Sequence, residues 1–167
     1  GNIGATNVLR TGNKFIALLT LLFDLLKGLI PVTLTNYYFP DYINISCLLC
    51  FLGHVFPIWL KFNGGKGVAT YLGILFAVTL EYGLLFIFTW LVISLIFKYS
   101  SLSSMFASLT VFIVSLLRET TNNIFITSEE LSTNFSFILF IFFILIIFTH
   151  RKNISNLKNK TEKKIKI

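Results

Sequence analysis

The sequence predicts an all-α fold, a polytopic bundle of transmembrane helices, and three observations support this prediction. Of the 167 residues, 55% are hydrophobic and 13% are charged, and the mean hydropathy is +0.81. This apolar share is more than a soluble core of this size can bury. The apolar residues also lie in long uncharged runs, and residues 137–148 lack the polar face that a soluble helix needs.

The apolar runs predict six spans in this chain, joined by short polar segments. In the first span we expect Pro31 to bend the helix, helped by Gly28. Residues 1–150 then form one integral membrane domain, and residues 151–167 form a basic cytoplasmic C-terminal tail. The expected helices cover residues 13–35, 42–60, 67–80, 82–97, 102–118 and 131–149.

Residues 68–97 fit either one span or two. As one helix, these 30 residues would reach about 45 Å, against a hydrocarbon core of about 30 Å. A turn at residues 81–83, which include a glutamate and a glycine, would divide them. With the tail in the cytoplasm, two helices place every Lys and Arg except Lys27 and Arg118 on the cytoplasmic side. The positive-inside rule favours that arrangement, so we expect two short helices here.

Charge and cysteine placement argue against other classes of protein. Seven of the fourteen Lys and Arg lie in residues 151–166, a segment too short and too poor in aromatic residues for nucleic-acid binding. We interpret Cys47 and Cys50, which lie in one apolar segment, as buried hydrophobic residues and not as a redox pair. His54 and His150 are the only histidines, so no metal site is expected.

Four polar segments fall on the cytoplasmic side of this topology, and their convergence at one end of a helix bundle indicates a site. They are GNIGATNVLR at residues 1–10, KFNGGKG at 61–67, KYSSLSS at 98–104 and HRKN at 150–153.

The glycine-rich segment predicts an anion site at the start of a helix. Gly64, Gly65 and Gly67 allow backbone N–H groups to approach a phosphate closely, and Lys66 adds a positive charge. The spacing of a Walker motif is absent. A flexible turn with a topology-setting lysine would account equally well for these residues.

The first polar segment repeats this chemistry in a flexible stretch. Asn2, Thr6 and Asn7 supply donors, and Arg10 supplies a fork for phosphate or carboxylate. The alternative is a capped loop leading into a helix. In YSSLSS the serines stand at a helix start, where N-capping accounts for one or two of them.

Asp24 and Lys27 lie inside the first span, on one helix face. Ionisable groups at membrane depth are functional candidates, and a self-satisfied ion pair that fixes helix packing is the equal alternative. His54 is a candidate site residue because Lys66 is expected at the same membrane level. Glu162, in the tail, is expected to be solvated. Donors for anions without an evident general base suit a substrate that is already activated, such as an acyl phosphate.

Together these motifs resemble the bacterial acyl-phosphate-dependent glycerol-3-phosphate acyltransferases, the PlsY family. The resemblance lies in residues 1–10, 53–70, 99–104 and 150–157, in the family's order, and in DLLKG at 24–28. It implies transfer of a fatty acyl group from acyl phosphate to the 1-hydroxyl of sn-glycerol 3-phosphate. The products would be lysophosphatidic acid and phosphate, in phospholipid synthesis. It also implies no metal or other cofactor, and a multi-pass protein of the bacterial inner membrane, in contact with membrane lipid, with a cytoplasmic active site.

The resemblance assigns roles to residues at matching positions. Catalytic roles are implied for Lys66, Ser101, Arg10, His54 and Asn153. Substrate binding is implied for Asn2, Thr6, Asn7, Gly64, Gly65, Gly67 and His150.

The chain also departs from the family's pattern. The family has a further helix and a serine before the glycine that matches Gly1, so seven spans are expected in the complete protein and an N-terminal part is expected to be missing here. Asn156 and Lys160 replace an expected basic residue and a common glycine. The alternatives are another membrane transferase acting on phosphorylated lipids, an anion transporter or channel, and a structural subunit. A transporter is disfavoured because no inverted repeat is visible.

Overall fold

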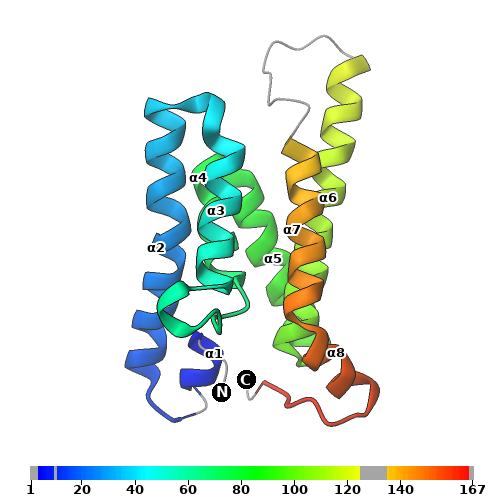
Figure 1. The fold of residues 1–167 in the computed structure, drawn as a ribbon. Helices are drawn as coiled ribbons and strands as arrows, with labels where there is room; N and C mark the ends of the chain where they lie inside the picture. The colour runs from blue at the N-terminus through cyan, green and yellow to red at the C-terminus, as the bar shows by residue number, and fades with distance from the viewer. Residues whose placement is uncertain (1–3, 10, 125–134, 166–167) are drawn as a thin grey trace. The chain divides into compact units, whose positions relative to one another are not determined.

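The computed structural model of the chain describes residues 4–9, 11–124 and 135–165, and for residues 121–124 it describes the backbone alone. The regular structure in these residues is helical, and they contain no β-strand. The chain forms two compact units, Gly1–Gly83 and Leu84–Ile167 (Figure 1).

The first unit is built around one long helix, α2. Its start is capped by Asn13, whose side chain accepts a hydrogen bond from the N–H of Ile16 at 3.0 Å. The helix continues through Pro31 and ends at Tyr38, beyond the predicted end at residue 35, and it packs against both α3 and α4. The elements of this unit are α1 (Ala5–Leu9), α2 (Lys14–Tyr38), α3 (Ile43–Val55) and α4 (Val68–Val78), with 3-10 helices at Pro40–Tyr42 and Ile58–Leu60.

Two glycines allow α2 and α4 to approach closely. A Cβ added at Gly28 would collide with the main-chain oxygen of Thr70, and one added at Gly73 would collide with that of Leu25. Thr70 Oγ1 also donates to the main-chain oxygen of Asp24 at 2.9 Å. Small residues at a helix interface permit such contacts in a membrane, where lipid gives no hydrophobic drive between helices. In the folded chain Gly28 therefore serves helix packing.

The predicted division of residues 68–97 into two helices is confirmed, but the break does not lie at residues 81–83. α4 ends at Val78, and Thr79 adopts an extended conformation with φ −157° and ψ 137°. α5 (Leu80–Phe97) follows, and Thr79 Oγ1 accepts a hydrogen bond from the N–H of Glu81 at 3.3 Å. A threonine can cap a helix start in this way, so residues 81–83 are helical instead of forming the predicted turn.

The second unit contains most of α5 together with α6 (Ser100–Ile124), α7 (Phe135–Thr149) and α8 (Arg151–Lys158). α6 and α7 are joined by the hydroxyls of Ser115 and Ser136, which lie 2.7 Å apart in a buried position. The rings of Phe112 and Phe140 pack beside them, with centroids 5.3 Å apart. The bend between α7 and α8 is 58°. The sequence predicted only a basic tail where α8 forms.

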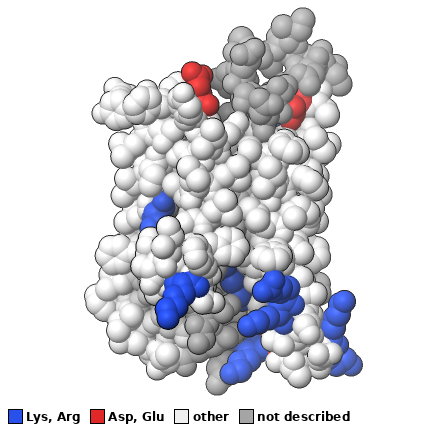
Figure 2. All heavy atoms as spheres, viewed as in Figure 1, with Lys and Arg blue, Asp and Glu red and all other residues white. Residues whose placement is uncertain are grey.

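Among the described residues, four helices are long and apolar enough to cross a membrane, and the bent pair of α7 and α8 would make a fifth span. They are Lys14–Tyr38, Pro40–Leu60, Leu80–Phe97 and Ser100–Thr120. α4 has 11 residues and would extend about 16 Å, roughly half of the hydrocarbon core. Much of the surface in Figure 2 carries no charged side chain, as these helices require. The count of six spans stays a prediction.

Candidate active site

In the first unit, residues 64–67, which we call the glycine loop, fold back onto the end of α3. The N–H of Gly64 donates to the main-chain oxygen of Val55 at 3.1 Å, and the N–H of Gly65 donates to that of His54 at 3.3 Å. A Cβ at Gly64 would also collide with the His54 oxygen. These two amides, which the sequence offered as phosphate donors, therefore satisfy carbonyls at the C-terminus of α3.

The start of α4 retains the geometry of an anion site. Gly67 is the N-cap, with φ +81°, and a Cβ there would collide with the buried ring of Phe51. Both the backbone conformation and the space therefore require glycine. The first amides of a helix have no partner within it, and its dipole favours an anion there. Lys66 precedes this position and is half-buried, so its charge adds to that of the helix end.

A buried polar cluster joins α2 to α3 near the glycine loop. Lys27 Nζ lies 2.8 Å from Asp24 Oδ1, and His54 Nδ1 lies 3.5 Å from the same oxygen. The side chains of Asp24 and His54 are 5% and 7% exposed. The ion pair that the sequence offered as one interpretation is therefore present, and it extends to His54 on another helix. We refer to Asp24, His54, Lys66 and Gly67 as the glycine-loop cluster.

Residues 5–9 form the short helix α1, where the sequence predicted a flexible polar loop. The main-chain oxygen of Gly4 accepts hydrogen bonds from the N–H groups of Asn7 and Val8, at 3.0 and 3.2 Å, which starts the helix. Asn7 is half-buried and Thr6 is exposed. Figure 1 shows α1 and the segment before α4 at the same end of the first unit. The predicted site residues Asn2 and Arg10 lie outside the described residues.

In the second unit, the carboxylate of Glu162 collects three donors. Ser101 Oγ donates to Glu162 Oε1 at 3.0 Å, and Asn153 Nδ2 donates to the same oxygen at 2.6 Å. Asn156 Nδ2 donates to Glu162 Oε2 at 3.3 Å. The expectation that Glu162 is solvated is wrong, because its oxygens hold the side chains of α6 and α8 together. We call Ser101, Asn153, Asn156 and Glu162 the Glu162 cluster.

Two contacts of the terminal segment hold Glu162 in this place. The N–H of Ile165 donates to the main-chain oxygen of Lys98 at 2.7 Å, and Lys164 Nζ lies 5.9 Å from the centre of the Tyr99 ring. The tail thus packs against the junction of α5 and α6. Ser101, next to this junction, is 3% exposed.

His150 occupies the position between α7 and α8. It is 2% exposed, and its Nδ1 lies 2.8 Å from the main-chain oxygen of Ile146. Because a carbonyl oxygen only accepts hydrogen bonds, Nδ1 carries the proton of the neutral ring, and Nε2 is then its acceptor nitrogen.

Comparison with known proteins decides the family. The family model described as glycerol-3-phosphate acyltransferase matches residues 1–160. The chain belongs to the glycerol-3-phosphate acyltransferase family. The resemblance seen in the motifs is therefore confirmed.

Relatives of this acyltransferase chain match it over nearly its whole length. The glycerol-3-phosphate acyltransferase of Pelagibacter ubique (strain HTCC1062) is 53% identical over 167 residues, covering 100% of this chain and 81% of the relative. That of Wolbachia pipientis subsp. Culex pipiens (strain wPip) is 46% identical, covering 98% of this chain and 81% of the relative.

Two crystal structures are similar to the acyltransferase chain at 34% sequence identity. Both are described as PlsY (YgiH), an integral membrane glycerol 3-phosphate acyltransferase. The glycerol 3-phosphate form has a TM-score of 0.88 and covers 99% of this chain and 79% of its own. The lysophosphatidic acid form has a TM-score of 0.87 and covers 98% and 80%. With its apolar helices, this chain is likewise an integral membrane protein.

Sequence reasoning about this acyltransferase missed two site contacts. It named Asp24 and His54 separately, and it left Glu162 in solvent. A signal for Glu162 was available, because it is the only acidic residue in a tail with seven Lys and Arg. Its partner Ser101 lies 61 positions earlier, so no local spacing connects the two.

Proposed function

We propose that this protein transfers a fatty acyl group from acyl phosphate to the 1-hydroxyl of sn-glycerol 3-phosphate, giving lysophosphatidic acid and phosphate. The observation that carries the proposal is the family match over residues 1–160. The similar crystal structures, described in glycerol 3-phosphate and lysophosphatidic acid forms, support the acceptor and the product. The donor rests on the motifs and on the site chemistry.

The proposed reaction balances without a cofactor. The 1-oxygen of glycerol 3-phosphate forms a bond to the acyl carbon, and the bond from that carbon to the phosphate oxygen breaks. The proton of the hydroxyl passes to a phosphate oxygen of a bound substrate. Because phosphate is a good leaving group, positioning and charge stabilisation supply most of the catalysis.

The start of α4 is the proposed phosphate site of the first unit. Lys66 and the end of the α4 dipole would neutralise a phosphate group. In this proposal Gly64 and Gly65 act by shaping the loop, since their N–H groups bond to α3. Further donors to the phosphorylated substrates are proposed at Asn2, Thr6, Asn7 and Arg10.

The Glu162 cluster is proposed to orient the attacking hydroxyl. Ser101 Oγ donates a hydrogen bond to Glu162. The lone pairs of this hydroxyl oxygen can therefore accept a hydrogen bond from a substrate hydroxyl. The amide of Asn153 is held by the same carboxylate. His150 would bind substrate through Nε2, because Nδ1 faces a main-chain carbonyl. In this proposal Glu162 holds donors in place and does not act as the base.

We also propose six spans, with α4 as a short one, in the bacterial inner membrane and with the site on the cytoplasmic side. The placement of basic residues supports this topology. In a cysteine-free background, single cysteines at Lys61 and Lys158 should react with an impermeant maleimide only from the cytoplasmic side, and one at Asp41 only from the other side. Labelling of positions 61 and 158 from opposite sides would contradict it.

The deciding experiment uses the purified full-length protein in detergent. It is given glycerol 3-phosphate with either acyl phosphate or acyl-CoA, and lysophosphatidic acid and phosphate are measured. We expect one phosphate released for each lysophosphatidic acid formed, and no product from acyl-CoA. Activity with acyl-CoA alone would overturn the choice of donor, and no product with either donor would overturn the proposed function.

A further inference from the structure

We propose that Asp24 is a positioning residue that acts through His54, with its carboxylate beside the His54 ring and its main chain bonded to the start of α4. The proposal rests on the proposed function, because the site it organises is the phosphate site of that function. No motif argument connects these residues, and their association comes from the three-dimensional arrangement.

The burial of Asp24 is the first step. An ionisable group inside a membrane span is costly unless it is paired. Lys27 pairs with Asp24 at 2.8 Å, but both residues are on α2 and the Lys27 side chain is 57% exposed. A pair within one helix would be satisfied at its surface as well. Packing the carboxylate at 5% exposure against α3 therefore needs a reason beyond the ion pair.

The His54 ring supplies that reason. Its Nδ1 lies 3.5 Å from Asp24 Oδ1, and the His54 side chain is 7% exposed. A carboxylate at Nδ1 favours the tautomer with the proton on that nitrogen and fixes the direction of the ring. Nε2 is then the nitrogen that remains for another group. Asp24 thereby sets both the orientation and the tautomer of His54, for which the family resemblance implies a catalytic role.

Asp24 also contacts both elements that flank the glycine loop. Its side chain lies against His54, whose main-chain oxygen accepts the N–H of Gly65 at 3.3 Å. Its main-chain oxygen accepts a hydrogen bond from Thr70 Oγ1, in the first turn of α4, at 2.9 Å. One residue of α2 therefore holds the end of α3 and the start of α4. A shift of Asp24 would move both ends of the loop.

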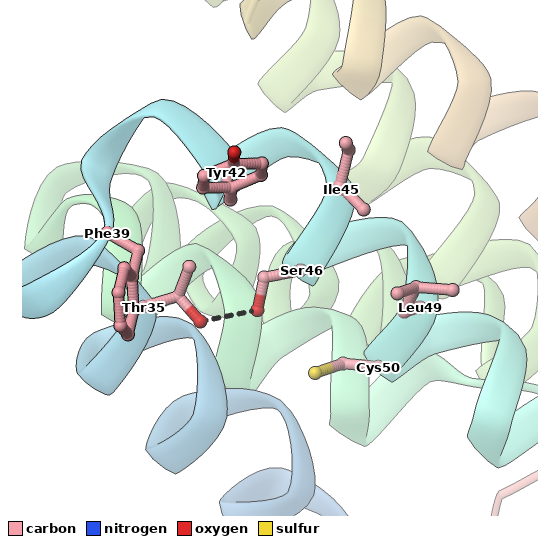
Figure 3. A pocket seen from close by; sticks show the side chains of 7 residues that line it. All are labelled: Thr35, Phe39, Tyr42, Ile45, Ser46, Leu49 and Cys50. Carbon is pink, nitrogen blue, oxygen red and sulfur yellow. Dashed lines mark hydrogen bonds between the residues drawn. The ribbon is translucent and has the colours of Figure 1, made fainter.

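The other end of the α2–α3 pair shows that packing alone does not need a charge. There Thr35 Oγ1 donates to Ser46 Oγ at 3.0 Å, at the wall of an apolar pocket of about 390 Å³ (Figure 3). Two hydroxyls suffice to join the helices at that place. Ser46→Ala is therefore a matched control, since it removes a polar α2–α3 contact away from the glycine loop.

Kinetics on the full-length protein in detergent test the proposal. Asp24→Asn keeps the size and removes the charge, and kcat/KM for glycerol 3-phosphate should fall about tenfold or more. Adding Asp24→Asn to His54→Gln should cause little further loss, because Asp24 acts through His54 and the two effects are then not additive. Lys27→Met should cost less than Asp24→Asn, and Ser46→Ala should leave activity unchanged. Losses that multiply in the double variant, or an equal loss from Lys27→Met, would overturn the proposal.

A second measurement depends neither on activity nor on the folding of any Asp24 or His54 variant. Nitrogen NMR of the wild-type protein labelled with ¹⁵N-histidine reports the ring proton of each of its two histidines, and His150→Gln assigns the signals. We expect the neutral His54 ring to carry its proton on Nδ1. A ring with its proton on Nε2 would overturn the proposal even if the acyltransferase assay succeeds. An Nδ1 proton together with an inactive wild-type enzyme would instead count against the proposed function.

Discussion

The glycine-loop cluster and the Glu162 cluster are built in different ways. In the first, the main chain dominates: Gly67 adopts a left-handed conformation that starts α4, and the loop amides bond to the end of α3. In the second, side chains dominate: Ser101 and Asn153 donate to a carboxylate from the terminal segment. A helix end with a lysine suits a phosphate, whereas a hydroxyl held by a carboxylate suits the orientation of another hydroxyl.

Because the two clusters are built differently, we expect damage to each one to change a different kinetic constant. Damage to a phosphate site weakens substrate binding and is expected mainly in KM. Damage to a group that orients the attacking hydroxyl is expected mainly in kcat, because it acts as the bond forms.

The largest effect is expected for Ser101→Ala in the Glu162 cluster. Without the hydroxyl, nothing at this position orients the substrate oxygen, and kcat should fall about a hundredfold while KM changes little. Ser103→Ala is the control, because the Ser103 hydroxyl donates to the main-chain oxygen of Tyr99, the residue just before α6. Steady-state kinetics with both substrates measure the split. A large rise in KM with unchanged kcat would remove the distinction between the clusters.

A smaller effect is expected for Lys66→Ala in the glycine-loop cluster. Losing a charge-assisted hydrogen bond of about 1.5–3 kcal/mol should raise the KM of one phosphorylated substrate roughly tenfold to a hundredfold. Lys61→Asn is the control: Lys61 is exposed and has φ +51°, a conformation that asparagine tolerates. Titration of each substrate against a saturating amount of the other identifies which one Lys66 binds. Unchanged KM for both would contradict the assigned role.

The same contrast explains which parts of the structure could be predicted. The long helices follow from uncharged runs, and the division between α4 and α5 follows from the length of residues 68–97 against the bilayer. The position of that break was wrong because an extended Thr79 ends α4, which composition does not reveal. α8 was missed because its basic residues dominate the sequence, although Ile154 and Leu157 are half-buried three positions apart.

The two clusters also differ in how far the sequence could predict them. The glycine loop is contiguous, so its glycines and Lys66 could be named from spacing alone. The hydrogen bonds of the Gly64 and Gly65 amides could not be predicted, because their acceptors depend on where α3 ends. The Glu162 cluster depends on chain segments that meet only in the folded unit. The family resemblance therefore pointed to Ser101 and Asn153, whereas the Glu162 carboxylate between them was expected to be solvated.

The smallest of the three effects is expected for Glu162→Gln. The glutamine can keep its one oxygen at the Oε1 position, where Ser101 and Asn153 donate, and it then presents its N–H₂ to Asn156, which donated to Oε2. The Asn156 bond is lost and the two remaining bonds are no longer assisted by a charge, which is worth about 1 kcal/mol, so kcat should fall about tenfold. Lys163→Gln, at the neighbouring exposed position, is the matched control. Because Glu162 acts through Ser101, the Ser101→Ala and Glu162→Gln double variant should be no slower than Ser101→Ala alone. A further tenfold loss in the double variant would mean that Glu162 touches the reaction directly, and the Glu162 cluster would then contain a second catalytic group.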